Sequence, residues 1–269
     1  MIKYIKKLLQ PLRKIWMDRK RKLATLSLFR RYLSSNEAEN LSALVSHTFE
    51  INITPKQIQE VAKWLRSTEK KMIGRIAGDI EDYILNYYMI YSASHIPSAK
   101  PIAHAEIGVL FGGSLLMMLH ALRNSRSDHF ALAIDPLDGY YGQNIDPASG
   151  LPVILENVIS NVKHMGFGME KVRIVKATSQ SQEALDVAGS YSLATLWIDG
   201  DHSYEGVKCD WINYSPFVVS GGYILIDNYH DGVFTGIDKF VDEYLLPNIS
   251  GWSVIAKINR SILFKKVNS

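Results

Sequence analysis

Oxygen-bearing side chains follow two apolar stretches of the sequence, at the point where each stretch ends. Asp199 comes directly after Leu193–Ile198, and Asp227 and Asn228 come directly after Tyr223–Ile226. If the two stretches are adjacent parallel strands, these side chains lie together at one edge of a sheet. Oxygen ligands without sulfur suit a hard cation, Mg²⁺ or else Mn²⁺ or Ca²⁺, and zinc fits less well although His202 keeps it open. The pattern therefore predicts a metal site, with solvated strand-end caps as the alternative.

A second group of residues, rich in glycine, stands where an earlier apolar stretch meets a helical one. Gly108 and Gly112 let the backbone approach a ligand closely, and the N-terminus of the following helix attracts negative charge. The spacing is not the dinucleotide fingerprint G-x-G-x-x-G, so a purely structural turn is the alternative. Asp135 ends the next apolar stretch, Phe130–Ile134, where an acid is placed to bond ribose hydroxyls. Together these features predict an adenosine-containing cofactor without choosing which one.

Short apolar stretches alternate with helical ones from residue 100 onwards, which favours a parallel sheet covered by helices on both faces. A turn at Asn259-Arg260 separates the last two stretches, so the last strand should run antiparallel to its neighbours. We therefore expect an α/β fold with a seven-stranded, mostly parallel sheet. The predicted strands are residues 103–109, 130–134, 172–175, 193–198, 223–226, 253–258 and 262–266.

The region before the sheet is helical by its pattern. One helix opens at Thr54-Pro55, with Thr54 as N-cap and Pro55 in the first turn, and another spans about Lys70 to Tyr91. We therefore divide the chain into three parts. They are a basic amphipathic segment at residues 1–31, a helical cap at 32–99 and a cofactor-binding domain at 100–269.

The first 31 residues differ in charge from the rest of the chain. They carry eleven Lys or Arg residues and one acid, whereas the remainder holds 19 basic and 26 acidic side chains. An acidic body is not typical of a nucleic-acid-binding protein, so we expect no nucleic-acid partner. Leu8, Leu12 and Trp16 share one face of a helical pattern that Pro11 interrupts. The segment either lies on an anionic membrane surface or packs on the body or on another subunit.

Cysteine use and length narrow the class of protein further. The single cysteine, Cys209, excludes an internal disulfide and a Cys-rich zinc site, and it fits a reducing compartment. A chain of 269 residues makes one large domain or a domain with an appendage. No apolar run approaches the roughly 18 residues of a membrane span. We expect a cytoplasmic protein, peripheral on the inner membrane surface if its basic segment binds lipid.

Four sequence blocks taken together resemble the class I S-adenosylmethionine-dependent methyltransferases. They are Glu-Ile-Gly-x3-Gly-Gly-Ser at 106–114, Ile-Asp-Pro at 134–136, Ile-Asp-Gly-Asp-His-Ser-Tyr-Glu-Gly at 198–206, and Gly-Gly-x-Ile-x-x-Asp-Asn at 221–228. The pattern is similar to the metal-dependent O-methyltransferases of the macrocin and mycinamicin sugar branch, and more distantly to catechol and caffeoyl-CoA O-methyltransferases. The resemblance covers residues 100–266 and implies a Rossmann-like fold.

The resemblance implies S-adenosylmethionine as the cofactor and gives each candidate residue a role toward it. Ser114 would bond the methionine carboxylate and Asp135 the ribose, whereas Ser179 and Gln180 would lie against the adenine. The glycine turn would pass beside the cofactor. The cofactor-binding residues that we expect are Glu106, Gly108, Gly112, Ser114, Asp135, Ser179 and Gln180.

The resemblance also implies that Asp199, Asp227 and Asn228 bind Mg²⁺ and that Asp199 and His202 are catalytic. His202 stands where catechol-type enzymes carry a general-base lysine and the sugar branch a histidine. An imidazole with an unperturbed pKa of about 6.5 can take the proton of a hydroxyl that a bound cation has acidified. We therefore expect a metal-dependent O-methyltransferase that acts on a hydroxylated small molecule, a sugar or a glycosylated metabolite, and that forms a homo-oligomer.

Two other function classes stay open. One is a catalytically inactive S-adenosylmethionine-binding scaffold or partner subunit, and the other is a nicotinamide-dependent oxidoreductase, which the missing dinucleotide fingerprint disfavours.

His230 is a weaker candidate for the general base. The loop Asp138–Pro152 is either a lid over the acceptor site or a surface excursion. Phe111 departs from the small residue common in the glycine turn of the family.

Overall fold

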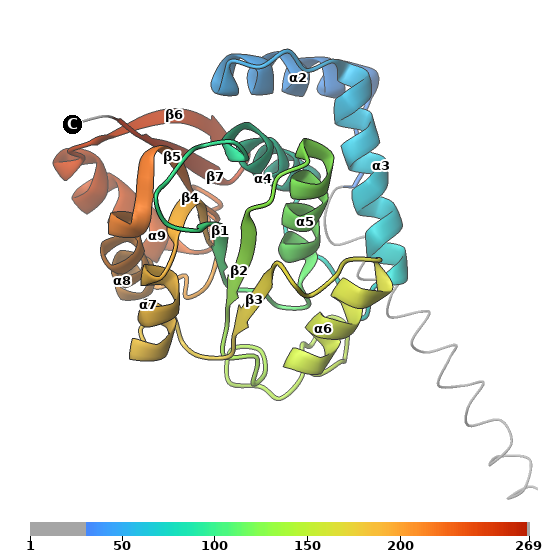
Figure 1. Ribbon diagram of the computed structural model, residues 1–269, viewed down its shortest axis with the longest axis vertical. Coiled ribbons are helices and arrows are strands. Elements are labelled where there is room, and N and C mark those ends of the chain that lie inside the picture. Colours follow the sequence, from blue (N-terminus) through green and yellow to red (C-terminus); the bar gives the residue numbers. More distant parts are fainter. Residues whose placement is uncertain (1–30, 268–269) are drawn as a thin grey trace, which may run out of the picture.

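A single sheet of seven strands forms the centre of the computed structural model, which describes residues 31–267 (Figure 1). The strand order is β3-β2-β1-β4-β5-β7-β6, in which β1 to β5 pair in parallel and β7 pairs antiparallel with both β5 and β6. This confirms the predicted Rossmann-like sheet and its antiparallel last strand. The strands are β1 Ile102–Ile107, β2 Phe130–Ile134, β3 Val172–Val175, β4 Ser192–Ile198, β5 Val218–Ile226, β6 Trp252–Ile258 and β7 Ser261–Lys266.

Helices cover both faces of the sheet, as predicted. In Figure 1, α4, α5 and α6 lie on one side of the sheet and α7, α8 and α9 on the other, while α2 and α3 form an outer layer over α4. Apolar side chains fill both interlayer spaces, with Leu116 and Val158 fully buried on the first side and Val241 and Ile224 on the second. The helices are α2 Ser35–Phe49, α3 Pro55–Lys71, α4 Ile80–Ala93, α5 Gly113–Ser125, α6 Leu155–His164, α7 Gln182–Gly189, α8 Tyr204–Tyr214 and α9 Thr235–Lys239.

Capping residues with polar side chains fix where the helices α2 and α3 begin. Thr54 caps α3 as predicted: its hydroxyl accepts from the backbone N–H of Gln57, whose side chain accepts from the N–H of Thr54. Ser34 and Glu37 make the same reciprocal pair at the start of α2. Such caps satisfy backbone donors that would otherwise lack partners and contribute about 1 kcal/mol each.

The single helix predicted from Lys70 to Tyr91 is wrong, because residues 72–79 break it into α3 and α4. Gly74 and Gly78 both have positive φ angles, 83° and 92°, which favour glycine. A Cβ atom on Gly74 would lie 2.2 Å from the ring of Phe111, so the break lets the chain pass directly over that ring. Phe111 itself is fully buried, which explains how a large residue is accommodated in the glycine turn.

The loop Asp138–Pro152 is tied to the broken segment by a buried ion pair. The guanidinium of Arg75 binds both carboxylate oxygens of Asp146, at 2.8 and 3.0 Å, and Asp146 is completely buried. Burial alone would raise the pKa of Asp146, but hydrogen bonds from Arg75 and Ser149 outweigh burial and lower it. The loop is therefore anchored at its middle. Tyr141, near the start of the loop, reaches the candidate site described below.

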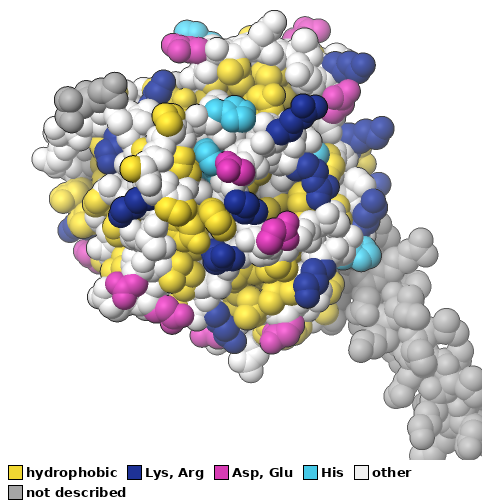
Figure 2. Space-filling model, in the orientation of Figure 1, with side chains coloured by type: hydrophobic (Ala, Val, Ile, Leu, Met, Phe, Trp, Pro, Cys, Tyr) yellow, Lys and Arg dark blue, Asp and Glu magenta, His cyan; other side chains and the backbone are white. Residues whose placement is uncertain are grey.

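The distribution of surface charge and the length and hydrophobicity of the helices concern the partners predicted for this protein. Lys and Arg side chains are interspersed with Asp and Glu across the face shown in Figure 2. None of the helices within residues 31–267 is both long and apolar enough to cross a membrane. The predicted amphipathic segment lies outside the described residues, apart from Arg31, so its two readings stay predictions.

Candidate active site

The candidate site lies at the edge where β1, β2, β4 and β5 end, which is the edge that binds ligands in open α/β sheets. Ile107 pairs with both Ile134 and Ile198, and Ile198 pairs with Ile226. This register makes the residues that follow the four strands emerge side by side. The predicted residues that it brings to one edge are Gly108, Asp135, Asp199 and Asp227.

The conformation of the glycine turn after β1 is required by the residues that pack against it. Gly108 has a φ of 90°, and a Cβ atom there would lie 2.0 Å from the carbonyl oxygen of Asp199. Any other residue at this position would push apart the ends of β1 and β4. Gly112, with a φ of 83°, is the N-cap of α5. Gly108 is therefore required by packing alone, whether or not a ligand lies beside it.

Glu106 is a buried carboxylate in need of a partner. It is 1% exposed, and neither of its oxygens has a hydrogen bond of normal geometry within the described residues. Burial raises its pKa well above the ordinary value, a rise that the nearby Ser114 hydroxyl opposes. A cationic donor at this point would satisfy the carboxylate. The amino group of S-adenosylmethionine is such a donor, so Glu106 and Ser114 fit the cofactor chemically.

Asp135 holds the glycine turn from the end of β2. One carboxylate oxygen accepts from the backbone N–H groups of Val109 and Leu110, at 2.7 and 3.3 Å, and the other accepts from Leu137 at 2.7 Å. Burial raises its pKa, and these three hydrogen bonds oppose the rise. Asp135 therefore shapes the turn as well as standing where ribose hydroxyls are expected.

Ser179 and Gln180 lie in the segment between β3 and α7. The Ser179 carbonyl accepts from the Tyr214 hydroxyl at 2.6 Å, which fixes this segment to α8. Burial raises the pKa of Asp210 to about 7, and a hydrogen bond with the Ser179 side chain opposes that rise. Gln180 is exposed. Ser179 is thus held firmly, whereas the predicted contact of both residues with adenine stays a prediction.

Asp199 and Asp227 emerge from neighbouring strands, as the sequence predicted. The backbone N–H of Asp227 donates to the carbonyl of Ile198 at 3.1 Å, which places the two acids in adjacent turns. Asp227 is 4% exposed. Burial raises its pKa well above the ordinary value, and the negative charges of Asp199 and Asp82 raise it further. Asn228 follows with a φ of 59°, and its amide donates to Asp231 at 2.9 Å.

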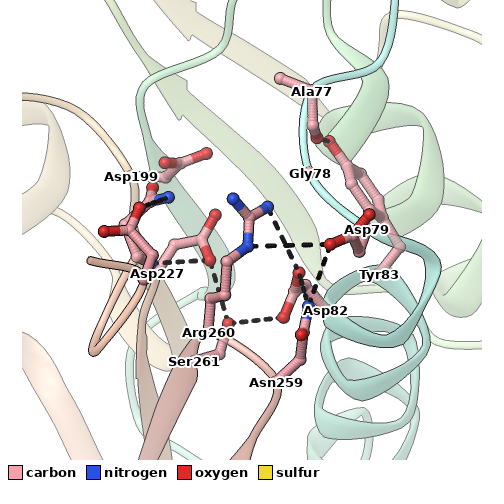
Figure 3. Close-up of polar contacts among 12 residues, drawn as sticks. Ala77, Gly78, Asp79, Asp82, Tyr83, Asp199, Asp227, Asn259, Arg260 and Ser261 are labelled. Carbon is pink, nitrogen blue, oxygen red and sulfur yellow. Dashed lines mark hydrogen bonds and ion pairs between the residues drawn. The ribbon is translucent and has the colours of Figure 1, made fainter. Parts of the chain in front are cut away.

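Two acids, Asp82 and Asp199, and one arginine, Arg260, act electrostatically on Asp227. Asp82, at the start of α4, and Asp227 both lie near the hydroxyl of Ser261, whereas the Arg260 guanidinium lies between Asp227 and the start of α4 (Figure 3). No three His, Cys, Asp or Glu side chains within residues 31–267 are grouped closely enough to hold a metal ion. A cation here would therefore need the Asn228 amide in addition to the acids. Two carboxylates and an amide are ligands suited to Mg²⁺.

His202 is held at both ring nitrogens. Its Nε2 lies 3.1 Å from an oxygen of Asp199, and its Nδ1 lies 3.1 Å from the Tyr141 hydroxyl. The Phe234 ring packs edge-on against the imidazole at 4.2 Å. A histidine fixed in this way beside a carboxylate at a strand end can act as a proton acceptor. The weaker candidate, His230, instead stacks on Tyr229 and pairs with a surface acid.

Four residues of this site were not predicted from the sequence. Tyr141 lies in a loop, and hydrophobic periodicity does not predict the path of a loop. In the sequence, Asp82 is typical of an acid in the first turn of a helix, where it interacts with the helix dipole. Arg260 and Ser261 read only as the turn and start of the last hairpin. No sequence spacing links these segments to the strand ends, because α4 and β7 meet the site only through the fold.

Comparisons with known proteins agree with this architecture. Residues 105–229 match a family model described as a methyltransferase domain. An uncharacterized protein, R132, of Acanthamoeba polyphaga mimivirus is 27% identical over 149 residues, which are 55% of this chain and 60% of that protein. The chain thus matches about three fifths of the length of that curated relative.

Two solved structures share the fold at low sequence identity. The O-methyltransferase NovP superposes with a TM-score of 0.56 and 19% identity, over 87% of this chain and 100% of NovP. The calicheamicin methyltransferase CalS11 gives 0.55 and 12%, over 87% of this chain and 94% of CalS11. The matched family model, the strand order and the glycine turn with its buried Glu106 agree, and the part of the chain at residues 105–229 is a methyltransferase domain of the class I S-adenosylmethionine-dependent type.

Proposed function

We propose that this protein transfers a methyl group from S-adenosylmethionine to a hydroxyl of a small molecule, a sugar or a glycosylated metabolite, with a divalent cation bound beside the acceptor. The observation that carries the proposal is the placement of Asp199, Asp227 and Asn228 after adjacent strands, next to His202. The acceptor class is supported by the solved structures of similar fold, one of which is described as a TDP-rhamnose 3'-O-methyltransferase, with a TM-score of 0.51.

The residues that would hold the cofactor surround the glycine turn. When bound, S-adenosylmethionine would supply a methyl group on a sulfonium sulfur, which an acceptor oxygen can attack at carbon while S-adenosylhomocysteine leaves. Glu106 would accept from its amino group, and Asp135 would face its ribose. The full set proposed is Glu106, Gly108, Gly112, Ser114, Asp135, Ser179 and Gln180.

The residues that would act on the acceptor follow strands β4 and β5. Asp199, Asp227 and Asn228 would hold Mg²⁺, which lowers the pKa of a bound hydroxyl when present. His202 would take the hydroxyl proton at Nε2 in the state in which the Asp199 carboxylate faces the cation, because Nε2 lies on the Asp199 side of the site. Tyr141 would orient the ring from the other nitrogen. The buried surroundings of Asp227 would exclude water from this side of the acceptor.

Removal of the cation tests the proposal. Protein treated with EDTA should lose turnover of a panel of hydroxylated sugars and glycosylated metabolites, measured by transfer of a labelled methyl group, and added Mg²⁺ should restore it. Full turnover after EDTA treatment would show that the metal assignment is wrong. Protein that binds the cofactor yet methylates none of the panel with Mg²⁺ present would favour the scaffold reading instead.

A further inference from the structure

We propose that Asp82, which belongs to the helical cap at residues 32–99, positions Asp227 through the hydroxyl of Ser261 and so forms part of the candidate metal site. This inference rests on the proposed function, because Asp227 is there a cation ligand. Asp82 touches neither the acceptor nor the cofactor in this arrangement, so it is a positioning residue.

The bridge consists of two hydrogen-bond contacts between segments far apart in the sequence. The Ser261 hydroxyl lies 3.0 Å from Oδ1 of Asp82 and 3.1 Å from Oδ1 of Asp227 (Figure 3). All three residues are buried, and Asp82 is completely inaccessible. The contacts therefore form a continuous hydrogen-bonded connection from the start of α4 to the end of β5.

The turn between β6 and β7 holds Asp82 in place with three consecutive residues. The Asn259 amide donates to Asp82 at 3.2 Å, the Arg260 guanidinium lies 3.9 Å from it, and Ser261 makes the bridge. The backbone N–H of Tyr229 donates to the Arg260 carbonyl at 2.7 Å, which fixes the turn to the segment after β5. A carboxylate buried this deeply is costly unless it is paired. Three partners from one turn therefore keep Asp82 in a single position.

The bridge determines which oxygen of Asp227 remains for a ligand. The backbone N–H of Asn228 donates to Oδ1 at 2.9 Å, and the Ser261 hydroxyl lies on the same Oδ1. Both of these contacts use one oxygen, which leaves Oδ2 for the cation. Partners behind a metal ligand fix its orientation in this way, and their loss commonly costs 10- to 100-fold in metal affinity. The helical cap would thus set the geometry of the site as well as cover the sheet.

The test compares three single substitutions in the full-length protein by their Mn²⁺ affinity, measured by electron paramagnetic resonance. Ser261→Ala removes the bridge without changing charge, and Asp82→Asn removes the far carboxylate. Asp79→Asn is the matched control, since Asp79 lies 3.8 Å from the same Arg260 and 3.3 Å from the same Asn259 amide, whereas the Ser261 hydroxyl bridges Asp82 and Asp227. S-adenosylhomocysteine affinity, measured on each variant, reports whether the fold is intact.

We expect Ser261→Ala and Asp82→Asn to weaken Mn²⁺ binding by about tenfold or more, and Asp79→Asn by much less, with unchanged S-adenosylhomocysteine affinity. Wild-type protein that binds Mn²⁺ while Ser261→Ala binds it equally well would overturn the positioning role and leave the proposed function standing. Wild-type protein that binds no Mn²⁺ would refute the proposed metal site, and the positioning role with it. A merely structural docking contact would lower the melting temperature of both variants without moving their Mn²⁺ affinity, which also overturns the inference.

Discussion

Replacing Asp227 with asparagine should reduce methyl transfer by about 10³-fold or more. The change removes a charged ligand from the proposed cation, whose stabilisation of the reacting oxygen amounts to several kcal/mol. The fold should survive, because burial and the charge of Asp199 already make an ionised carboxylate costly at this position. We expect the melting temperature to stay the same or to rise. Initial rates at saturating Mg²⁺ measure the first effect, and thermal unfolding measures the second.

The control for this variant is Asp242→Asn, which makes the same chemical change at an acid that bonds Tyr229 and His230, outside the proposed ligand set. It should keep near wild-type turnover. Both variants should bind S-adenosylhomocysteine with wild-type affinity, because neither residue is proposed to touch the cofactor. Retention of more than a tenth of wild-type turnover by Asp227→Asn would rule out Asp227 as a metal ligand.

Replacing His202 with asparagine should lower kcat by about 10²- to 10⁴-fold, the usual contribution of a positioned general base. Asparagine keeps a polar side chain beside Asp199 and Tyr141 but cannot take up a proton at neutral pH. Binding of S-adenosylhomocysteine should be unaffected. The measurement is kcat at saturating concentrations of both substrates with Mg²⁺ present.

His230→Asn is the matched control, because His230 is also hydrogen-bonded to an acid but its partner, Asp242, is outside the proposed ligand set. We expect its kcat to remain within a few-fold of wild type. If His202→Asn lowers the melting temperature yet leaves kcat within threefold of wild type, His202 has a packing role next to Phe234 and is not the base.

The sheet was predictable because its strands carry their own signals. The apolar run 193–198 is buried on both faces, so it reads as a central strand without any knowledge of its neighbours. The adjacent register of β4 and β5 then follows from the parallel fold, and with it the meeting of Asp199 and Asp227. The break between α3 and α4 could not be foreseen in this way, because it depends on the contact of Gly74 with Phe111, a tertiary event.

The site was predictable only where its residues follow strands. Asp82 and Ser261 contribute through contacts between segments 179 residues apart in the sequence, and no local pattern encodes that distance. The need for glycine at position 108 was predicted, but for an incomplete reason. The pattern indicated an approaching ligand, with a purely structural turn as the alternative, and the structure shows an approaching backbone carbonyl from Asp199.

Calorimetric titration with S-adenosylhomocysteine, with NAD as the comparison ligand, tests most directly whether the edge formed by Glu106, Asp135 and Asp199 is a methyltransferase site. We expect S-adenosylhomocysteine to bind with a stoichiometry of one per chain and NAD to give no binding heat. Replacement of Glu106 by glutamine should weaken the S-adenosylhomocysteine binding. Absence of S-adenosylhomocysteine binding by the wild-type protein, or binding of NAD with comparable affinity, would contradict the assignment.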